Sequence, residues 1–219
     1  MFKNVKKLVA VIFVLAISSI VFSSPSLLGP SGLFITTDAG VIEKSNVSAG
    51  VTIWNDSLDP SFFVNYGIFN NAEVSIASLP NEEVTANAKY TFLLEENSKI
   101  GVNAAVGVND VFSSAKLTPY IVADLHVIEF DEVMSVDDTK LTLGFGMGGR
   151  NSLLGMRGLF GGVQTTVFDM VTLALEYDGD DFNCGAKAKY GNLGASIAWT
   201  GPGQQMRLGA YYETKVNLN

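Results

Sequence analysis

The feature that most limits the fold of this chain is an alternation of apolar and polar residues with a period of two. It is clearest at 205–218, where one face is uncharged and the other carries Arg207, Glu213 and Lys215. A period of two is typical of β-strands whose two faces meet different surroundings, whereas a helix repeats near 3.6 residues. No convincing helical period follows the first residues of the chain. The sequence therefore predicts an all-β fold.

The alternation predicts about twelve strands, each bounded by turn-forming residues. They are expected at 46–54, 61–69, 72–78, 84–92, 100–108, 117–127, 140–148, 158–167, 171–177, 182–190, 193–200 and 205–218. Counts from ten to fourteen remain open, because residues 32–38 are a further candidate strand.

The composition of the two strand faces favours an antiparallel transmembrane β-barrel. In the strands with the clearest alternation, the apolar face carries no charge and the polar face is rich in Gly, Ser, Thr and Asn. Charged residues make up 16% of the chain, against roughly 25% in soluble proteins. Aromatic residues near strand ends are candidates for interfacial girdles, namely Phe62, Tyr90, Tyr177, Phe182, Tyr190 and Trp199. The alternative is a soluble periplasmic β-barrel that binds an apolar ligand.

The first residues are typical of a secretory signal peptide. Three lysines, Lys3, Lys6 and Lys7, precede an apolar run of 15 residues at 8–22, and a membrane-spanning helix needs about 20. We predict cleavage after Ser23, export, and residence in the bacterial outer membrane. The predicted organisation is a signal peptide at 1–23, an N-terminal extension, plug or extra strand at 24–45, and a β-barrel at 46–219.

The lengths of the connections predict the orientation of the barrel. Short turns at 70–71, 95–98, 168–170 and 191–192 alternate with longer or more acidic connections. Outer-membrane barrels place their short turns in the periplasm, so both ends of the barrel are expected there. The connection at 128–139 is too long for this pattern, and the sequence offers no explanation for it.

Few residues have the chemistry of a catalytic or metal site. Without the signal peptide the net charge is −11, because that segment holds three of the 14 basic residues and none of the 22 acidic ones. This charge argues against a nucleic-acid partner. The single histidine, His126, lies two residues from Asp124 and suggests, as an alternative, a barrel enzyme acting on lipid or glycan. The acids at 178–181 are interpreted as a solvated turn. We predict no catalytic residue, metal or cofactor, and Cys184 cannot form an internal disulfide.

Charged residues on the polar faces of the last strands are candidate lumen-lining residues. They are Lys187, Lys189, Arg207, Lys215, Glu176 and Glu213. Two interpretations remain open for them: a narrow polar passage with a preference for anions, or a network of ion pairs that rigidifies and closes the interior.

Four stretches of the chain resemble the YjbH-type outer-membrane barrels, which are linked with exopolysaccharide production. They are GPSGL at 29–33, YGIFNNAEV at 66–74, LFGGV at 159–163 and LEYDGDDFN at 175–183. The resemblance implies a non-enzymatic narrow pore or structural component of the envelope, connected with polysaccharide export or assembly. The expected partners are outer-membrane lipids, the barrel-assembly machinery and polysaccharide or export components. The chain departs from the usual barrel pattern by ending in Leu-Asn rather than an aromatic residue.

Overall fold

The computed structural model describes residues 24–54, 60–79, 84–96, 100–112, 117–130, 136–148, 156–201 and 205–216. The predicted signal peptide at 1–23 lies outside these residues. Among the described residues, no helix has the length and apolar character needed to cross a membrane.

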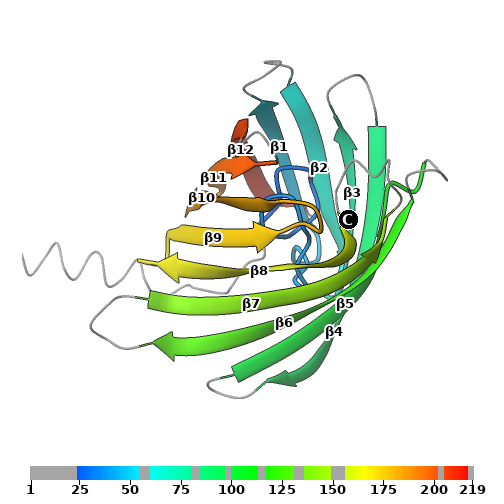
Figure 1. Ribbon diagram of the computed structural model, residues 1–219. Helices are drawn as coiled ribbons and strands as arrows, with labels where there is room; N and C mark the ends of the chain where they lie inside the picture. Colours follow the sequence, from blue (N-terminus) through cyan, green and yellow to red (C-terminus); the bar gives the residue numbers. More distant parts are fainter. Residues whose placement is uncertain are drawn as a thin grey trace, which may run out of the picture.

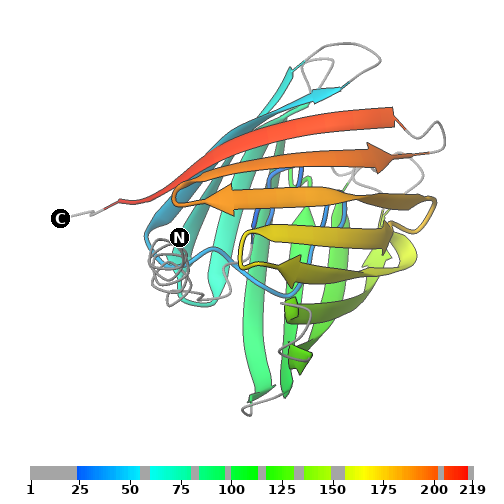
Figure 2. The ribbon, with the colours of Figure 1, turned by 90° about the vertical axis from the view of Figure 1, so that its left-hand side faces the viewer.

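Twelve antiparallel strands form one closed barrel, as the alternation predicts (Figure 1). The strands are β1 (Asn46–Trp54), β2 (Pro60–Phe69), β3 (Ala72–Ser78), β4 (Val84–Glu96), β5 (Ile100–Asn109), β6 (Thr118–Phe130), β7 (Val136–Met147), β8 (Arg157–Val167), β9 (Val171–Tyr177), β10 (Phe182–Tyr190), β11 (Leu193–Thr200) and β12 (Gln205–Lys215). Each strand pairs with its neighbours in sequence, and β1 closes the ring by pairing with β12 from Asn46 opposite Lys215. The start of β1 and the end of β12 therefore lie at the same end of the barrel, which Figure 2 shows from the side.

The connection at 128–139 is mostly strand. β6 continues to Phe130 and β7 begins at Val136, with these two residues paired and a register shift between Val136 and Asp138. A shift in β4 between Leu93 and Glu95 likewise carries that strand through Glu96, beyond its predicted end. Because such a bulge interrupts the period of two, the alternation stops before the strand does.

The two faces of the wall are arranged in the opposite sense from a soluble protein. Apolar side chains such as Leu143 and Phe182 point outward and are 62% and 72% exposed. Polar side chains such as Asn65, Asp124 and Glu176 point inward and are buried. An apolar outer surface around a polar interior is the pattern of barrels that sit in lipid.

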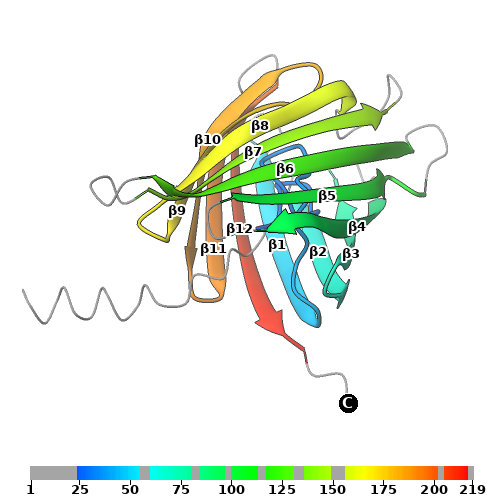
Figure 3. The ribbon, with the colours of Figure 1, turned by 90° about the horizontal axis from the view of Figure 1, so that it is seen from below.

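Residues 24–42, which we call the plug, occupy the interior of the barrel. Figures 1 and 3 show this segment in blue inside the ring of strands. Every residue at 25–39 is buried, although the segment has only two isolated bridges, Pro25 with Ser31 and Gly32 with Thr37, in the part described. Its apolar residues Leu28, Ile35 and Ala39 join one cluster with wall residues that include Phe63, Ala77, Ala105, Tyr120, Val122 and Phe160. The hydrophobic core of this molecule therefore lies between the plug and the inner wall.

Candidate functional site

The carboxylate of Glu176, on β9, binds one turn of the plug through its main chain. It accepts the N–H groups of Phe34 at 3.1 Å, Ile35 at 2.8 Å and Thr36 at 3.3 Å, and the Thr36 hydroxyl at 3.0 Å. The side-chain amide of Asn183 donates a further bond at 3.1 Å. A buried carboxylate is tolerated only when its oxygens are bonded, and here the plug supplies most of the donors.

Two further wall carboxylates bind main-chain N–H groups at other points of the plug. Glu73, on β3, accepts the N–H of Ser31 at 2.9 Å, the Ser31 hydroxyl at 2.6 Å and the N–H of Ile42 at 2.9 Å. Asp124, on β6, accepts the N–H of Ala39 at 2.8 Å. Carboxylates from β3, β6 and β9 thus hold the plug from different sides of the ring.

Two lysines of the wall bind the carbonyl groups of the plug. Lys89, on β4, donates to the carbonyl oxygens of Ser31 at 2.8 Å and Asp38 at 3.1 Å. Lys187, on β10, donates to those of Gly32 at 2.6 Å and Pro25 at 2.9 Å. Main-chain groups that are buried outside regular structure need such partners, so the wall replaces the hydrogen bonds that a strand or helix would have supplied.

Asp38 is the charged side chain of the plug, and it lies between two wall lysines. Its carboxylate contacts the Nζ of Lys140, on β7, and lies 3.7 Å from the Nζ of Lys89. Burial alone would raise the pKa of Asp38, but the positive charges of Lys140 and Lys89 outweigh it and hold that pKa well below its usual range. Asp38 is therefore ionised at any physiological pH, which strengthens its bonds to the lysines.

Two inward glycines make room for the apolar side chains of the plug. A Cβ added to Gly162 would lie 2.6 Å from Cδ2 of Leu33, and one added to Gly185 would lie 2.9 Å from Cζ of Phe34. The same Cβ atoms would also lie 2.5 Å from the carbonyl oxygen of Leu175 and 2.2 Å from that of Ile197, respectively. A side chain at either position would therefore clash with both the plug and the neighbouring strand. The ammonium of Lys187 also lies 5.7 Å from the centre of the Phe34 ring.

The six candidate lumen-lining residues divide into those that touch the plug and those that do not. Lys187 and Glu176 both bind the plug, a role that neither of the two interpretations left open by the sequence includes. Lys189 pairs with Glu213 at 2.9 Å, and Arg207 lies over the ring of Trp54 at 3.7 Å. Lys215 is exposed at the end of β12.

Sequence reasoning overlooked several residues that hold the plug: Glu73, Lys89, Lys140 and Asp38. Glu73 and Lys89 lie directly opposite each other on β3 and β4, at polar positions of two strands that the alternation predicts. A complementary pair of charges on facing inward positions was therefore a usable signal. Asp38 offered no such signal, because it lies in a segment without periodicity.

His126 and Asp124 do share the inner face, but their contacts are those of a wall rather than of a catalytic pair. The Asp124 carboxylate accepts hydrogen bonds from Ala39 and from the hydroxyl of Thr142. The ring of His126 lies 4.0 Å from Asp124 and 3.9 Å from Asp138, and 3.4 Å from the side-chain amide of Asn103. Among the described residues, no cluster of three or more potential ligands could hold a metal ion. Cys184 is exposed on the outer face.

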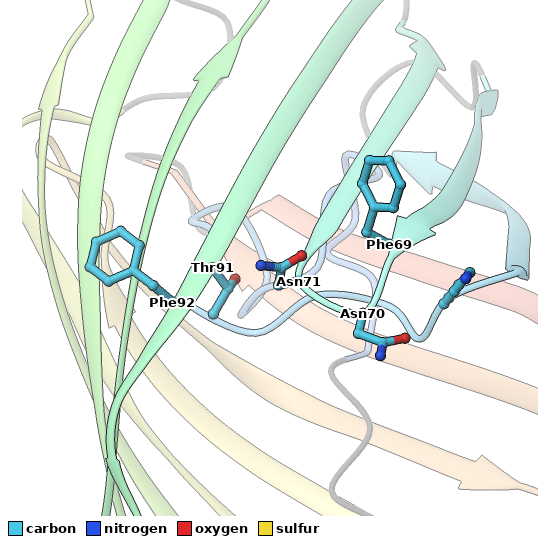
Figure 4. Close-up of a pocket in the computed structure, with 6 residues that line it drawn as sticks. Phe69, Asn70, Asn71, Thr91 and Phe92 are labelled. Carbon is cyan, nitrogen blue, oxygen red and sulfur yellow. The ribbon is translucent and has the colours of Figure 1, made fainter.

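An open cavity of about 630 Å³ lies at the end of the barrel that carries the short turns (Figure 4). Its lining comes from the β2–β3 turn, β4 and the segment leading into β1: Lys44, Phe69, Asn70, Asn71, Thr91 and Phe92. The hydroxyl of Thr91 donates to the carbonyl oxygen of Ala39. The cavity therefore lies next to the place where the plug leaves the interior.

Comparison with known proteins shows the fold alone. No family model matches the chain, and no curated protein matches it. Among solved structures it is similar to the KdgM porin, at 11% identity and a TM-score of 0.57 over 78% of this chain and 99% of that one. The KdgM porin in complex with disordered oligogalacturonate gives 12% identity and a TM-score of 0.56 over the same shares. Acinetobacter baumannii Omp33 is more distant, at 10% identity and a TM-score of 0.46 over 78% of this chain and 97% of that one.

Proposed function

We propose that this protein is a non-enzymatic barrel of the bacterial outer membrane whose polar interior is a passage closed by its own N-terminal segment. The observation that carries the proposal is the burial of residues 25–39 inside the ring. Their main-chain groups are bonded to charged side chains from β3, β4, β6, β9 and β10. In this arrangement the plug fills the interior, so conduction requires that it move.

The location in the outer membrane is supported by the outer face of the barrel and by its fold. Exposed apolar side chains occur on every strand, for example Val64, Leu143, Leu173 and Leu208. Such a surface is costly in water and stable in lipid. The KdgM porin shares the fold, and it is described as a porin. Outer-membrane lipids and the barrel-assembly machinery are the partners that this location implies.

The finer proposal is a connection with an envelope polysaccharide, either its export or its assembly. It is supported by the resemblance of 29–33, 66–74 and 175–183 to the YjbH-type barrels. These three stretches contribute Ser31, Glu73 and Glu176 to the bonds that hold the plug. The KdgM porin is described in complex with an oligogalacturonate, so in that protein a sugar chain accompanies this fold.

The experiment is a planar-bilayer recording of the purified full-length protein and its Glu176→Gln variant. The wild type is expected to be closed for most of the time, with brief openings. Gln keeps the size of the side chain but removes the charge and one acceptor, and each bond to a charged group contributes roughly 1.5–3 kcal/mol. The variant should therefore be open at least tenfold more of the time.

The matched control is Glu213→Gln, because Glu213 is a buried inward glutamate that accepts hydrogen bonds from Asn46 and Lys189, both residues of the wall. This variant should behave like the wild type. Two results would overturn the proposal. A steady large conductance of the wild type would show that the plug does not close the passage. A complete absence of conductance in both the wild type and Glu176→Gln would leave only a structural role.

A further inference from the structure

We propose that the inner wall is a peptide-binding site, which accepts a segment of another polypeptide in place of its own plug. The ligand expected is a peptide with two adjacent apolar residues followed, four residues later, by a carboxylate. This inference rests on the proposed function, because the site is accessible only in a barrel whose plug can move.

The first argument is that the wall recognises the main chain. Glu73, Asp124 and Glu176 accept the N–H groups of six plug residues: Ser31, Phe34, Ile35, Thr36, Ala39 and Ile42. Lys89 and Lys187 donate to four plug carbonyls, and the hydroxyl of Thr52 donates to a fifth, that of Leu27, at 2.9 Å. Peptide groups present this alternation of donor and acceptor in any sequence, so the bonds are available to another polypeptide.

The second argument is that the wall also selects side chains. Gly162 and Gly185 leave space for the adjacent residues Leu33 and Phe34, both fully buried. Lys140 and Lys89 bind the carboxylate of Asp38, four residues after Phe34. A peptide with a lysine or arginine at the position of Asp38 would meet two positive charges. The site therefore distinguishes among peptides although most of its hydrogen bonds go to the main chain.

The third argument is that the charges nearest Asp38 stay paired when it leaves. Lys89 lies 3.2 Å from the Glu73 carboxylate, and Lys140 lies 3.7 Å from that of Asp124. Removing Asp38 therefore leaves two lysines with two carboxylates, rather than isolated charges, which are costly to bury. Exchange of one peptide for another is accordingly compatible with an intact wall.

The test uses full-length chains in which the plug, and not the wall, is altered. In Gly32→Val the added Cβ would lie 2.2 Å from the carbonyl oxygen of Thr36, so the plug cannot keep its turn. Phe34→Asp is a second variant, which introduces a charge at a fully buried position of the plug. Both variants should conduct. A synthetic peptide of residues 24–42 with the native sequence is then added to the bilayer.

We expect the native peptide to reduce the conductance of both variants in a saturable manner. A control peptide carries N-methyl groups at Phe34, Ile35 and Thr36, which removes the donors to Glu176 while keeping the side chains. It should need at least a tenfold higher concentration, since the loss of one bond to a charged group already changes affinity by about that factor. Fluorescence anisotropy of the labelled peptides with the detergent-solubilised variants should likewise show tighter binding of the native peptide than of the N-methylated one.

Four outcomes would contradict the proposals, and the first two separate this inference from the proposed function. If neither plug variant conducts more than the wild type, the proposed passage itself is wrong. If the variants conduct but the native peptide neither blocks them nor binds, only the peptide site is wrong. A neutral oligosaccharide that blocks where the peptide does not would overturn the peptide site in favour of a sugar site. Equal potency of the native and N-methylated peptides would contradict recognition of the main chain.

Discussion

At the scale of single residues, the interior of this barrel shows how a buried charge can be stabilised by a ligand within the same chain. Glu176 is 1% exposed, and four of its hydrogen bonds come from three consecutive plug residues, Phe34, Ile35 and Thr36. A carboxylate that is buried without hydrogen-bond donors is costly. Glu176 and the plug therefore depend on each other.

The first residue-scale prediction concerns Asp38 and pH. Because its pKa in the folded protein is held below the usual value of 3.8, its contribution to plug binding is fully present above about that pH and declines as the pH falls further. The wild type should remain closed from neutral pH down to about pH 5 and open more often below about pH 4. Bilayer recordings over this range measure the effect.

Asp38→Asn provides the comparison for this pH prediction. The variant loses the charge that binds Lys140 and Lys89, a loss of roughly 1–3 kcal/mol, so it should open more often than the wild type already at pH 7. Its further opening on acidification should be smaller than that of the wild type, because the side chain at position 38 no longer takes up a proton. An Asp38→Asn variant as closed as the wild type at pH 7 would contradict the role assigned to this residue.

At the scale of elements, the strands were predictable from the sequence, whereas a plug was only one of three alternatives for residues 24–45. The period of two is a local property that follows from the different surroundings of the two faces of each strand, an apolar outer surface and a polar interior. It therefore identified all twelve strands, although some of their predicted ends differ from the structure. Bulges that shift the register lie beyond the predicted end of β4 and before the predicted start of β7, and β12 ends at Lys215 rather than at 218. Residues 24–42 have no local pattern, because their conformation is set by bonds to distant strands.

The candidate site was predictable to the extent that it lies on strands. Glu176 and Lys187 were recognised because the alternation places them on the polar face. Their partners were not, because Phe34 and Gly32 are 142 and 155 residues away in sequence. Ion pairing between wall residues was one of the two interpretations, and it describes Lys189 and Glu213. It also describes Lys89 with Glu73 and Lys140 with Asp124, but it does not account for the bonds from these residues to the plug.

The element-scale prediction is that a cysteine in the plug is protected from water-soluble thiol reagents. In a Cys184→Ser background, Ala39→Cys places a thiol at a fully buried position of the plug, and Lys44→Cys places one at an exposed position between the plug and β1. Labelling with a charged maleimide should be at least tenfold slower at position 39. Adding Glu176→Gln should accelerate labelling at position 39, and Glu213→Gln should not. Equal labelling rates at the two positions would show that the plug does not occupy the interior.

At the scale of the whole molecule, the arrangement of surfaces reverses that of a soluble protein. The outer surface is apolar along the strands, and the inner wall is polar except where it meets apolar residues of the plug. In a soluble barrel, so many exposed apolar side chains would promote aggregation. We therefore expect the protein in the membrane fraction, with an unheated band on a denaturing gel that migrates differently from the heated one.

The whole-molecule prediction is that the outer face does not tolerate charge at mid-height. Leu143 is 62% exposed and pairs with the middle of both neighbouring strands, at Ala123 and Gly161. Arginine at the midplane of a bilayer costs about 2–4 kcal/mol in a barrel, so Leu143→Arg should lower the temperature at which the unheated band is lost. Phe112→Arg is the control, since Phe112 is 67% exposed but lies in the β5–β6 connection. In a soluble barrel both substitutions would be neutral.

The closure of the ring by β1 and β12 has a consequence for the order of assembly. The plug precedes β1 in the chain, yet its partners include residues of β9 and β10, the latter up to 163 positions later. Those partners do not surround it until nearly all of the wall exists, and contacts between such distant positions form slowly. The segment synthesised before the barrel is thus the last to reach its final place. A barrel whose strands pair in a wrong register would misplace the carboxylates and glycines that contact the plug. Binding of the plug in its final position therefore requires a wall with the correct register.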